Sequence, residues 1–190
     1  MSNSFKFKKS VQSVTFFAQK EGGTINYMKA GKLVYLADKL HLRKYGRSIT
    51  NDTYVAMKNG PVPSRTKDII LKSEWFGHDI VEYSNMYLTR PEGYNISSIG
   101  ELESKVFSQT DLALLEQVYN EYGHLNEFDL SDYTHTFPEW KRFESQLTAD
   151  RNRAFPIISD DLFLPLNSDR TLSQNEELLA MSKEVYQNMY

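Results

Sequence analysis

Residues 32–64 have the sequence KLVYLADKLHLRKYGRSITNDTYVAMKNGPVPS, which predicts a long helix, a turn, a short strand and an elbow. At about 100° per residue, Leu33, Leu36 and Leu40 fall on one face of the helix, which is therefore predicted to be mostly buried. Asn26 is suited to cap the first turn of this helix, and Gly46 is suited to end it.

A narrow basic stripe lies on the same helix. Lys32, Lys39 and Arg43 fall within about 40° of one another on a helical wheel. The stripe is either a solvated strip or a contact for an acidic surface of a partner. Asp38 and His41 are three positions apart and could touch, and such a pair is most often a structural hydrogen bond.

A strand and a stiff elbow are predicted after the helix. Residues 53–57 are rich in β-prone side chains, and Gly60 lies just beyond them. Pro61 and Pro63 remove two backbone donors and disfavour helix at the preceding residues, so the elbow should be extended. The missing N–H groups also make it unsuitable as a phosphate-binding loop. Ser64 is predicted to cap the next helix.

The flanking segments are predicted to be mostly helical. A second β-ribbon is expected at residues 80–83 and 86–88. Residues 146–170 are polar and irregular, and the last helix carries an apolar stripe at Leu178, Met181, Val185 and Met189. The predicted fold is mainly α, of the α+β class: a compact bundle of about seven helices with a small antiparallel β-element. It is expected to form one domain over residues 1–190.

Composition limits the classes of protein to which the chain can belong. A length of 190 residues suits one domain with a sizeable core. The chain has no cysteine, which excludes disulfides, thiolate nucleophiles and cysteine-based zinc sites. No apolar run approaches the roughly 18 residues of a membrane span, and the N-terminus lacks the apolar core of a signal peptide. The protein is therefore expected to be cytoplasmic and without a membrane partner.

Charge is distributed unevenly along the sequence. Residues 1–67 have a balance of +10, and residues 68–190 have a balance of −13. Such polarity can steer a charged protein partner or bind nucleic acid. It can also be neutralised internally, if basic helices pack beside acidic ones.

Motifs for catalysis and for nucleic-acid binding are missing from the sequence. No two of the histidines are spaced three to five residues apart, as a metal-binding pair requires; they are His41, His78, His124 and His135. The sequence contains no Walker, Rossmann or nucleophile-elbow pattern. It also contains no zinc finger, RNP-like strand or basic leucine zipper. We therefore expect no enzymatic activity, no metal and no cofactor, and we expect nucleic acid to be an unlikely partner.

Five motifs together resemble those of a known family. They are KLVYLAD (32–38), KYGRSI (44–49), DTYVAMKNGPVPS (52–64), VYNEYG (118–123) and LSDYTH (130–135). Their order and spacing resemble the Panacea domain, which is the SocA-like antitoxin domain of bacteria and their phages. The recognisable anchors span residues 26–143. Residues 146–190 carry none, so this part is expected to be a partner-specific C-terminal extension of the Panacea domain.

The resemblance implies an antitoxin that neutralises a cognate protein toxin, encoded by an adjacent gene, through direct binding. One SocA-like member instead delivers its toxin to a ClpXP-type protease, and the sequence does not separate sequestration from delivery. Two further alternatives are an enzyme or nucleotide-binding protein that uses Asp38, His41 and the basic stripe, and a nucleic-acid-binding protein. Homo-oligomerisation also remains open.

The residues predicted to bind the partner lie on the elbow and on the helix beside it. A stiff elbow loses little entropy on binding, and nearby tyrosines could supply contact area. Lys32 and Arg43 would provide rim charges that speed encounter. The predicted set is Lys32, Tyr35, Arg43, Tyr54, Asn59, Gly60, Pro61 and Val62. In the alternative interpretation the elbow only defines the fold, the tyrosines pack beneath it, and His135 is structural.

Overall fold

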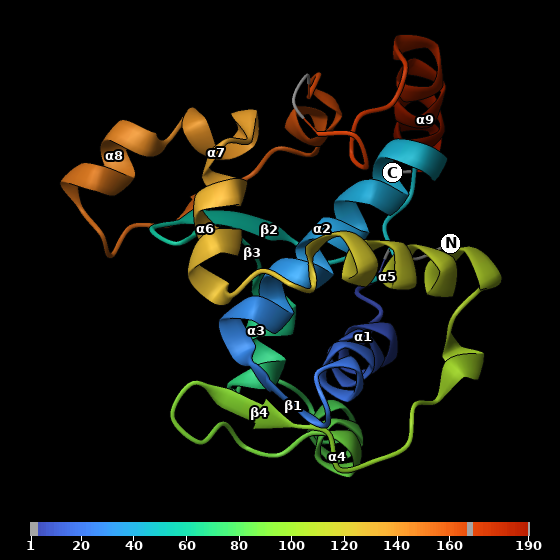
Figure 1. Ribbon diagram of the computed structural model, residues 1–190, viewed down its shortest axis with the longest axis vertical. Coiled ribbons are helices and arrows are strands. Elements are labelled where there is room, and N and C mark those ends of the chain that lie inside the picture. The colour runs from blue at the N-terminus through green and yellow to red at the C-terminus, as the bar shows by residue number, and fades with distance from the viewer. Residues whose placement is uncertain (1–3, 167–168, 190) are drawn as a thin grey trace.

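The computed structural model describes residues 4–166 and 169–189, which are mainly helical with two small antiparallel sheets (Figure 1). The helices are α1 (Phe7–Lys20), α2 (Tyr27–Tyr45), α3 (Ser64–Ile70), α4 (His78–Tyr87), α5 (Gln109–Tyr122), α6 (Glu127–His135), α7 (Pro138–Lys141), α8 (Glu144–Ala149) and α9 (Glu176–Met189). The strands are β1 (Thr24–Asn26), β2 (Tyr54–Met57), β3 (Gly60–Pro63), β4 (Asn95–Ser97) and β5 (Phe155–Pro156), and the short 3₁₀ helices are η1 (Ser104–Val106) and η2 (Ser159–Phe163). Seven helices in the described part have seven residues or more, which confirms the predicted fold class.

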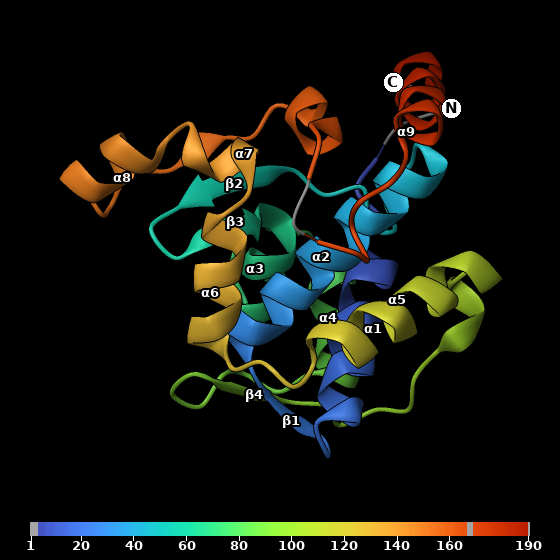
Figure 2. The ribbon, with the colours of Figure 1, turned by 45° about the horizontal axis from the view of Figure 1, so that its top comes forward.

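Helix α2 is the centre of the fold and contacts α1, α5, α6, α9 and β3 (Figures 1 and 2). The Asn26 side chain accepts hydrogen bonds from the N–H groups of Met28 and Lys29, at 2.8 and 3.4 Å. Gly46 ends the helix in the left-handed conformation, with φ of 67°. The predicted leucine stripe is fully buried at Leu33, Leu36 and Leu40. Both predicted ends and the burial of this helix are confirmed.

The predicted strand and elbow form a β-hairpin. Tyr54 of β2 pairs with Pro63 of β3, and Met57 pairs with Gly60 at the turn. Gly60 has φ of 98°, a conformation that side-chain-bearing residues rarely adopt. Strand β5 adds to the other edge of β2, so that β2 is the central strand of three.

Helix α3 follows the hairpin directly, and its first turn is capped by Asp52. The Asp52 carboxylate accepts the N–H groups of Arg65 and Thr66, at 2.9 and 2.8 Å. The Ser64 side chain makes no capping bond, so that prediction was wrong. Asp52 replaces it because the antiparallel hairpin returns the chain to the residues that precede β2.

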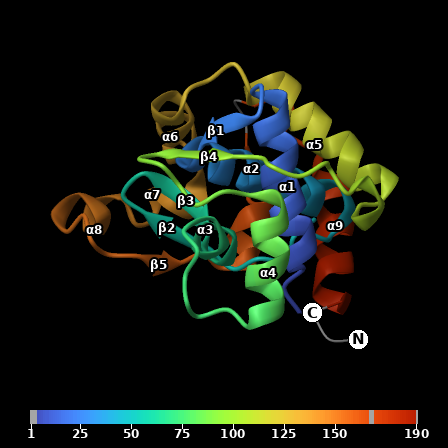
Figure 3. The same ribbon diagram turned by 90° about the horizontal axis from the view of Figure 1, so that it is seen from below.

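The second predicted β-ribbon was also wrong, because residues 78–87 form helix α4. Ile80, Tyr83 and Tyr87 are spaced for one face of a helix, and α4 packs on α1 (Figure 3). The second sheet instead pairs β1 with β4, where buried Ile25 lies opposite buried Ile96.

The unequal charges of the two parts of the sequence meet inside the fold. Lys9 and Arg47 form ion pairs with the buried carboxylate of Asp111 on α5. His41 Nε2 lies 2.9 Å from the same carboxylate. Burial disfavours the charged form of Asp111, but hydrogen bonds from His41, Lys9 and the Ser108 N–H outweigh it and hold the pKa well below its ordinary value. Internal neutralisation therefore accounts for part of the asymmetry.

The basic stripe of α2 is buried, so both expectations for it were wrong. Lys39 pairs with Glu139 of α7, and the two side chains are 1% and 0% exposed. Arg43 is fully buried, and its guanidinium donates hydrogen bonds of 2.7–2.8 Å to the carbonyl oxygens of Leu162, Leu164 and Leu172. Because these positions of α2 are enclosed by later elements, their cations must find partners within the protein.

The segment around α9 packs on the far end of α2 (Figure 2). A Cβ atom added to Gly46 would lie 2.4 Å from the Ser182 carbonyl oxygen and 2.7 Å from Val185 Cβ. The buried residues of α9 are Leu179 and Ser182. The predicted apolar stripe is instead largely exposed, at Met181, Val185 and Met189. Close approach of α9 to α2 thus depends on a glycine.

Candidate functional site

The β2–β3 hairpin turn is held by side-chain donors from three helices. The hydrogen bonds run to backbone carbonyl oxygens, from Lys32 to Pro61, from Ser131 to Asn59, from His135 to Lys58 and from Trp140 to Met57, at 2.7–3.0 Å. These donors belong to α2, α6 and α7. Because four carbonyls of the turn are already bound, its backbone conformation is fixed by the fold.

Lys32 lies beneath this turn. Its residue exposure is 3%, and Nζ donates to the Pro61 carbonyl at 2.9 Å. A Cβ atom at Gly60 would lie 2.3 Å from the same Nζ and 2.5 Å from Thr134 Oγ1, so only glycine fits there. Burial lowers the pKa of Lys32 from 10.5 to about 7.

His135 and Trp140 support the turn from the other side. Their rings stack with centroids 3.8 Å apart and an interplanar angle of 22°. Burial lowers the pKa of His135, and the charge of Lys32 lowers it further. Because the Lys58 carbonyl can only accept, the hydrogen bond places a proton on Nε2 of His135. The prediction that His135 is structural agrees with these contacts.

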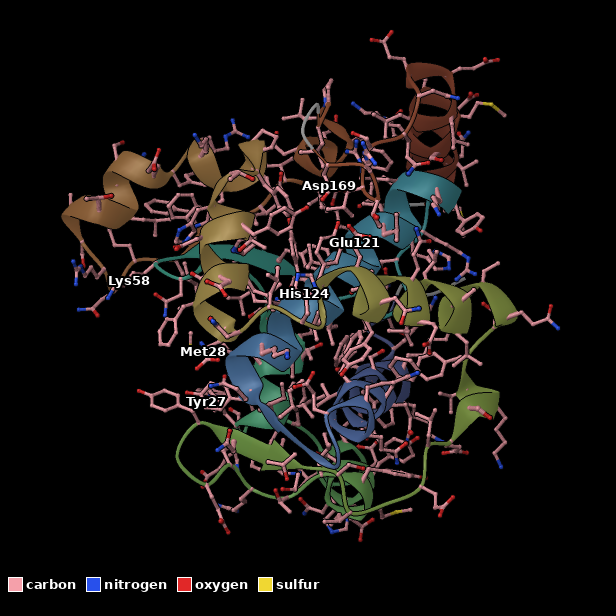
Figure 4. The ribbon with its side chains drawn as sticks, in the orientation of Figure 1. Tyr27, Met28, Lys58, Glu121, His124 and Asp169 are labelled. Atoms are coloured by element: carbon pink, nitrogen blue, oxygen red, sulfur yellow. The ribbon has the colours of Figure 1, made fainter. Side chains whose placement is uncertain are left out.

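A pocket of about 280 Å³ opens beside the turn, between the hairpin, the start of α2, and α3. It is lined by Tyr27, Met28, Gly31, Lys32, Met57, Lys58, Asn59, Pro61, Val62, Lys67, Ile70, Leu71 and Arg151. Figure 4 shows Lys58 on the hairpin and Tyr27 and Met28 at the start of α2, on the same side of the molecule. The pocket therefore combines apolar walls with basic side chains, and its described lining contains no acidic residue.

The structure brings part of the predicted site together at this pocket. Lys32, Asn59, Pro61 and Val62 line it, and Gly60 packs against Lys32. Whether these residues bind a partner stays a prediction. Their positions confirm only that the elbow and the first turns of α2 share one surface.

Other predicted site residues lie elsewhere. Tyr35 is fully buried, and its hydroxyl donates to Glu139. The Tyr54 hydroxyl donates to Asp38 at 2.9 Å, and Arg43 is fully buried at the other end of α2. The expectation that Lys32 and Arg43 are rim charges was therefore wrong, because α2 is central and both cations are bound by carbonyl groups.

Sequence reasoning missed several pocket residues, namely Met28, Lys58, Lys67 and Arg151. Lys58 and Lys67 flank the elbow in sequence, and this closeness to the elbow could have indicated that they share its surface. Arg151 follows α8 and reaches the pocket only through the path of the chain after α7. No local pattern connects this arginine to the hairpin.

Asp38 and His41, the other candidate pair, belong to separate hydrogen-bond networks. Asp38 accepts hydrogen bonds from the N–H groups of Ile49 and Thr50, at 2.8 and 2.9 Å. His41 contacts Asp111 and the Arg47 carbonyl instead. Among the described residues, no group of three histidine or carboxylate side chains could hold a metal ion. No helix in the same part of the chain is long and apolar enough to span a membrane.

The described part of the chain is therefore a mainly helical α+β fold with a braced β-hairpin beside an open pocket. The family model described as antitoxin SocA-like, Panacea domain, matches residues 31–141, and the chain belongs to this family. No curated protein and no solved structure matches the chain. The matched residues include all four donors and four acceptors of the hairpin turn, so three of the five motifs, at residues 32–38, 52–64 and 130–135, meet in space at this site.

Proposed function

We propose that this protein is an antitoxin that neutralises a cognate protein toxin by direct binding and without catalysis. Membership of the antitoxin family supports the class of function. The observation that favours direct binding is the hairpin turn, which is held by four side-chain donors and borders an open pocket. A surface formed in advance loses little conformational entropy when a partner docks.

The proposed contact surface is the hairpin turn together with the mouth of the pocket. Asn59 and Lys58 are exposed at the turn, and Val62 is half-buried beside them. Gly60 and Pro61 contribute by shaping the turn. We also propose that the complex forms in the cytoplasm and that an adjacent gene encodes the toxin.

The test is co-expression with the product of the neighbouring open reading frame, measured as growth rescue and as affinity co-purification. Direct neutralisation requires a neighbour that is toxic alone, harmless with this protein and recovered in a stable complex. If growth is rescued while the toxin level falls, and the toxin returns when a ClpXP-type protease is deleted, the protein delivers its toxin for proteolysis and does not sequester it. A harmless neighbour that does not associate would contradict the proposal for that gene pair.

A further inference from the structure

The pocket beside the hairpin contains positive charge that the protein itself does not neutralise. Lys58, Lys67 and Arg151 all line it. Within the described residues, no carboxylate lies within 4.0 Å of any of these three cations. Elsewhere in the fold, basic side chains such as Lys39 are paired with acids. The local excess of charge favours an anionic ligand.

The walls of the pocket are apolar. Met28, Val62, Ile70 and Leu71 contribute to them, and Leu71 is 41% exposed. A pocket of about 280 Å³ is large enough for one large aliphatic or aromatic side chain. Apolar walls with a basic rim therefore suit a ligand that has an apolar body and negative charge beside it.

The backbone around the pocket restricts how a partner can bind. Pro61 and Pro63 offer no N–H group on β3, and the Pro61 carbonyl is occupied by Lys32. The strand therefore cannot extend its ladder to an added strand. The first N–H groups of α3 are occupied by Asp52, so they are not available to hold a phosphate. Recognition must come from side chains that enter the pocket.

We propose that this pocket binds an acidic peptide segment of the partner, which inserts one large apolar side chain between α2 and α3 while its flanking carboxylates contact Lys58, Lys67 and Arg151. The inference rests on the proposed antitoxin function for the identity of the partner. The chemistry of the ligand follows from the pocket alone, so the pocket proposal and the antitoxin proposal can fail separately.

The chain offers a variant that fills the pocket without straining the backbone. Gly31 lines the pocket within α2, and a Cβ atom added there meets no atom within 4 Å. Gly31→Leu should occupy the space intended for the apolar side chain. Gly31→Ala is the matched control, because it makes the same change of backbone entropy with much less bulk.

Charge is tested by a second pair of variants. Lys58→Glu reverses a charge at the pocket. Lys105→Glu reverses one on η1, where the Lys105 side chain is 83% exposed and pairs with Glu103. Thermal unfolding of each variant checks that it is folded. Both lysines are exposed, so neither change should disturb the core.

The probes are short fluorescent peptides with a central leucine and flanks of glutamate, serine or lysine, together with a glutamate-flanked peptide that has a central alanine. Fluorescence anisotropy with the full chain should give the highest affinity for the glutamate–leucine peptide. Loss of its acidic flanks or of its leucine should each weaken binding about tenfold. Gly31→Leu and Lys58→Glu should weaken it by about as much, whereas Gly31→Ala and Lys105→Glu should stay within about twofold.

Three outcomes would overturn the inference. The peptides could bind equally to wild type and Gly31→Leu; inorganic phosphate or ATP could bind in preference to the acidic peptide; or a toxin complex could form unchanged with Gly31→Leu and Lys58→Glu. The last outcome would leave the antitoxin function standing and reject only the pocket. Selective peptide binding without any toxin complex would support the pocket chemistry and count against the antitoxin proposal.

Discussion

The Lys32 ammonium donates a 2.9 Å hydrogen bond to the Pro61 carbonyl and thereby ties the central helix to the hairpin turn. The two residues are 29 positions apart, and the bond is buried. Gly60 leaves just enough space for the ammonium group, since a Cβ atom there would lie 2.3 Å from Nζ. The geometry of the candidate site therefore depends on a lysine amino group that is almost inaccessible to solvent.

Removing the indole donor beneath the turn should loosen the hairpin. Trp140→Phe keeps an aromatic ring but leaves the partly buried Met57 carbonyl without its 2.7 Å bond. We expect a loss of about 1–2 kcal/mol in the free energy of unfolding, measured by urea denaturation, and faster amide exchange in the hairpin. Trp75→Phe is the control because Trp75 is 92% exposed. Equal effects of the two substitutions would show that the indole bond contributes nothing.

Lys32→Met should change how stability depends on pH. Burial lowers the pKa of Lys32 in the folded protein to about 7, whereas in the unfolded chain it returns to about 10.5. Between these values the unfolded chain binds more protons, so this residue makes wild-type stability rise with pH. Relative to Lys32→Met, wild type should gain up to about 1.4 kcal/mol per pH unit in this window.

Urea denaturation of wild type and Lys32→Met between pH 7.5 and 9.5 measures this difference. His135, which faces Lys32 from α6, has a lowered pKa and stays neutral throughout that range. Lys58, Lys67 and Arg151 line the same pocket and are retained in both proteins. A pH-independent difference would show that Lys32 titrates normally in the folded state.

A single methyl group at Gly46 should disturb the packing of α9. Gly46 has φ of 67°, and an added Cβ would lie 2.4 Å from the Ser182 carbonyl oxygen. Gly46→Ala should destabilise the protein by more than about 1 kcal/mol, from strain and from overpacking. Gly31→Ala should instead be neutral or stabilising by up to about 1 kcal/mol. Thermal denaturation of the pair decides this, and similar melting temperatures would contradict the close contact.

Loss of Arg43 should release the segment that leads to α9. Arg43→Met removes the donors for the carbonyls of Leu162, Leu164 and Leu172 and retains most of the side-chain volume. At about 1 kcal/mol for each bond, we expect a loss of about 3 kcal/mol. Hydrogen exchange should show increased opening of α9, and limited proteolysis should cleave the segment faster. Arg90→Met, at an exposed position, serves as control, and unchanged exchange in α9 would disprove the anchoring role.

Local patterns predicted the elements whose signals lie within a few residues of each other. The cap at Asn26, the leucine stripe and the stop at Gly46 defined α2 correctly. The prolines correctly indicated an extended elbow. The prediction for residues 78–87 was wrong because a short apolar segment fits both the period of a strand and the period of a helix. Only the packing of Tyr83 against α1 selects the helix.

The sequence by itself thus determined the mainly helical class, the central helix, the hairpin and, through its motifs, the family. Only the tertiary structure decided which charges are accessible. Lysine and arginine usually lie at solvated surfaces. Lys32 and Arg43 are buried because elements that come later in the chain enclose this part of α2. The pocket likewise joins Met28, Lys58 and Arg151 from three separate segments, a proximity that no local pattern encodes.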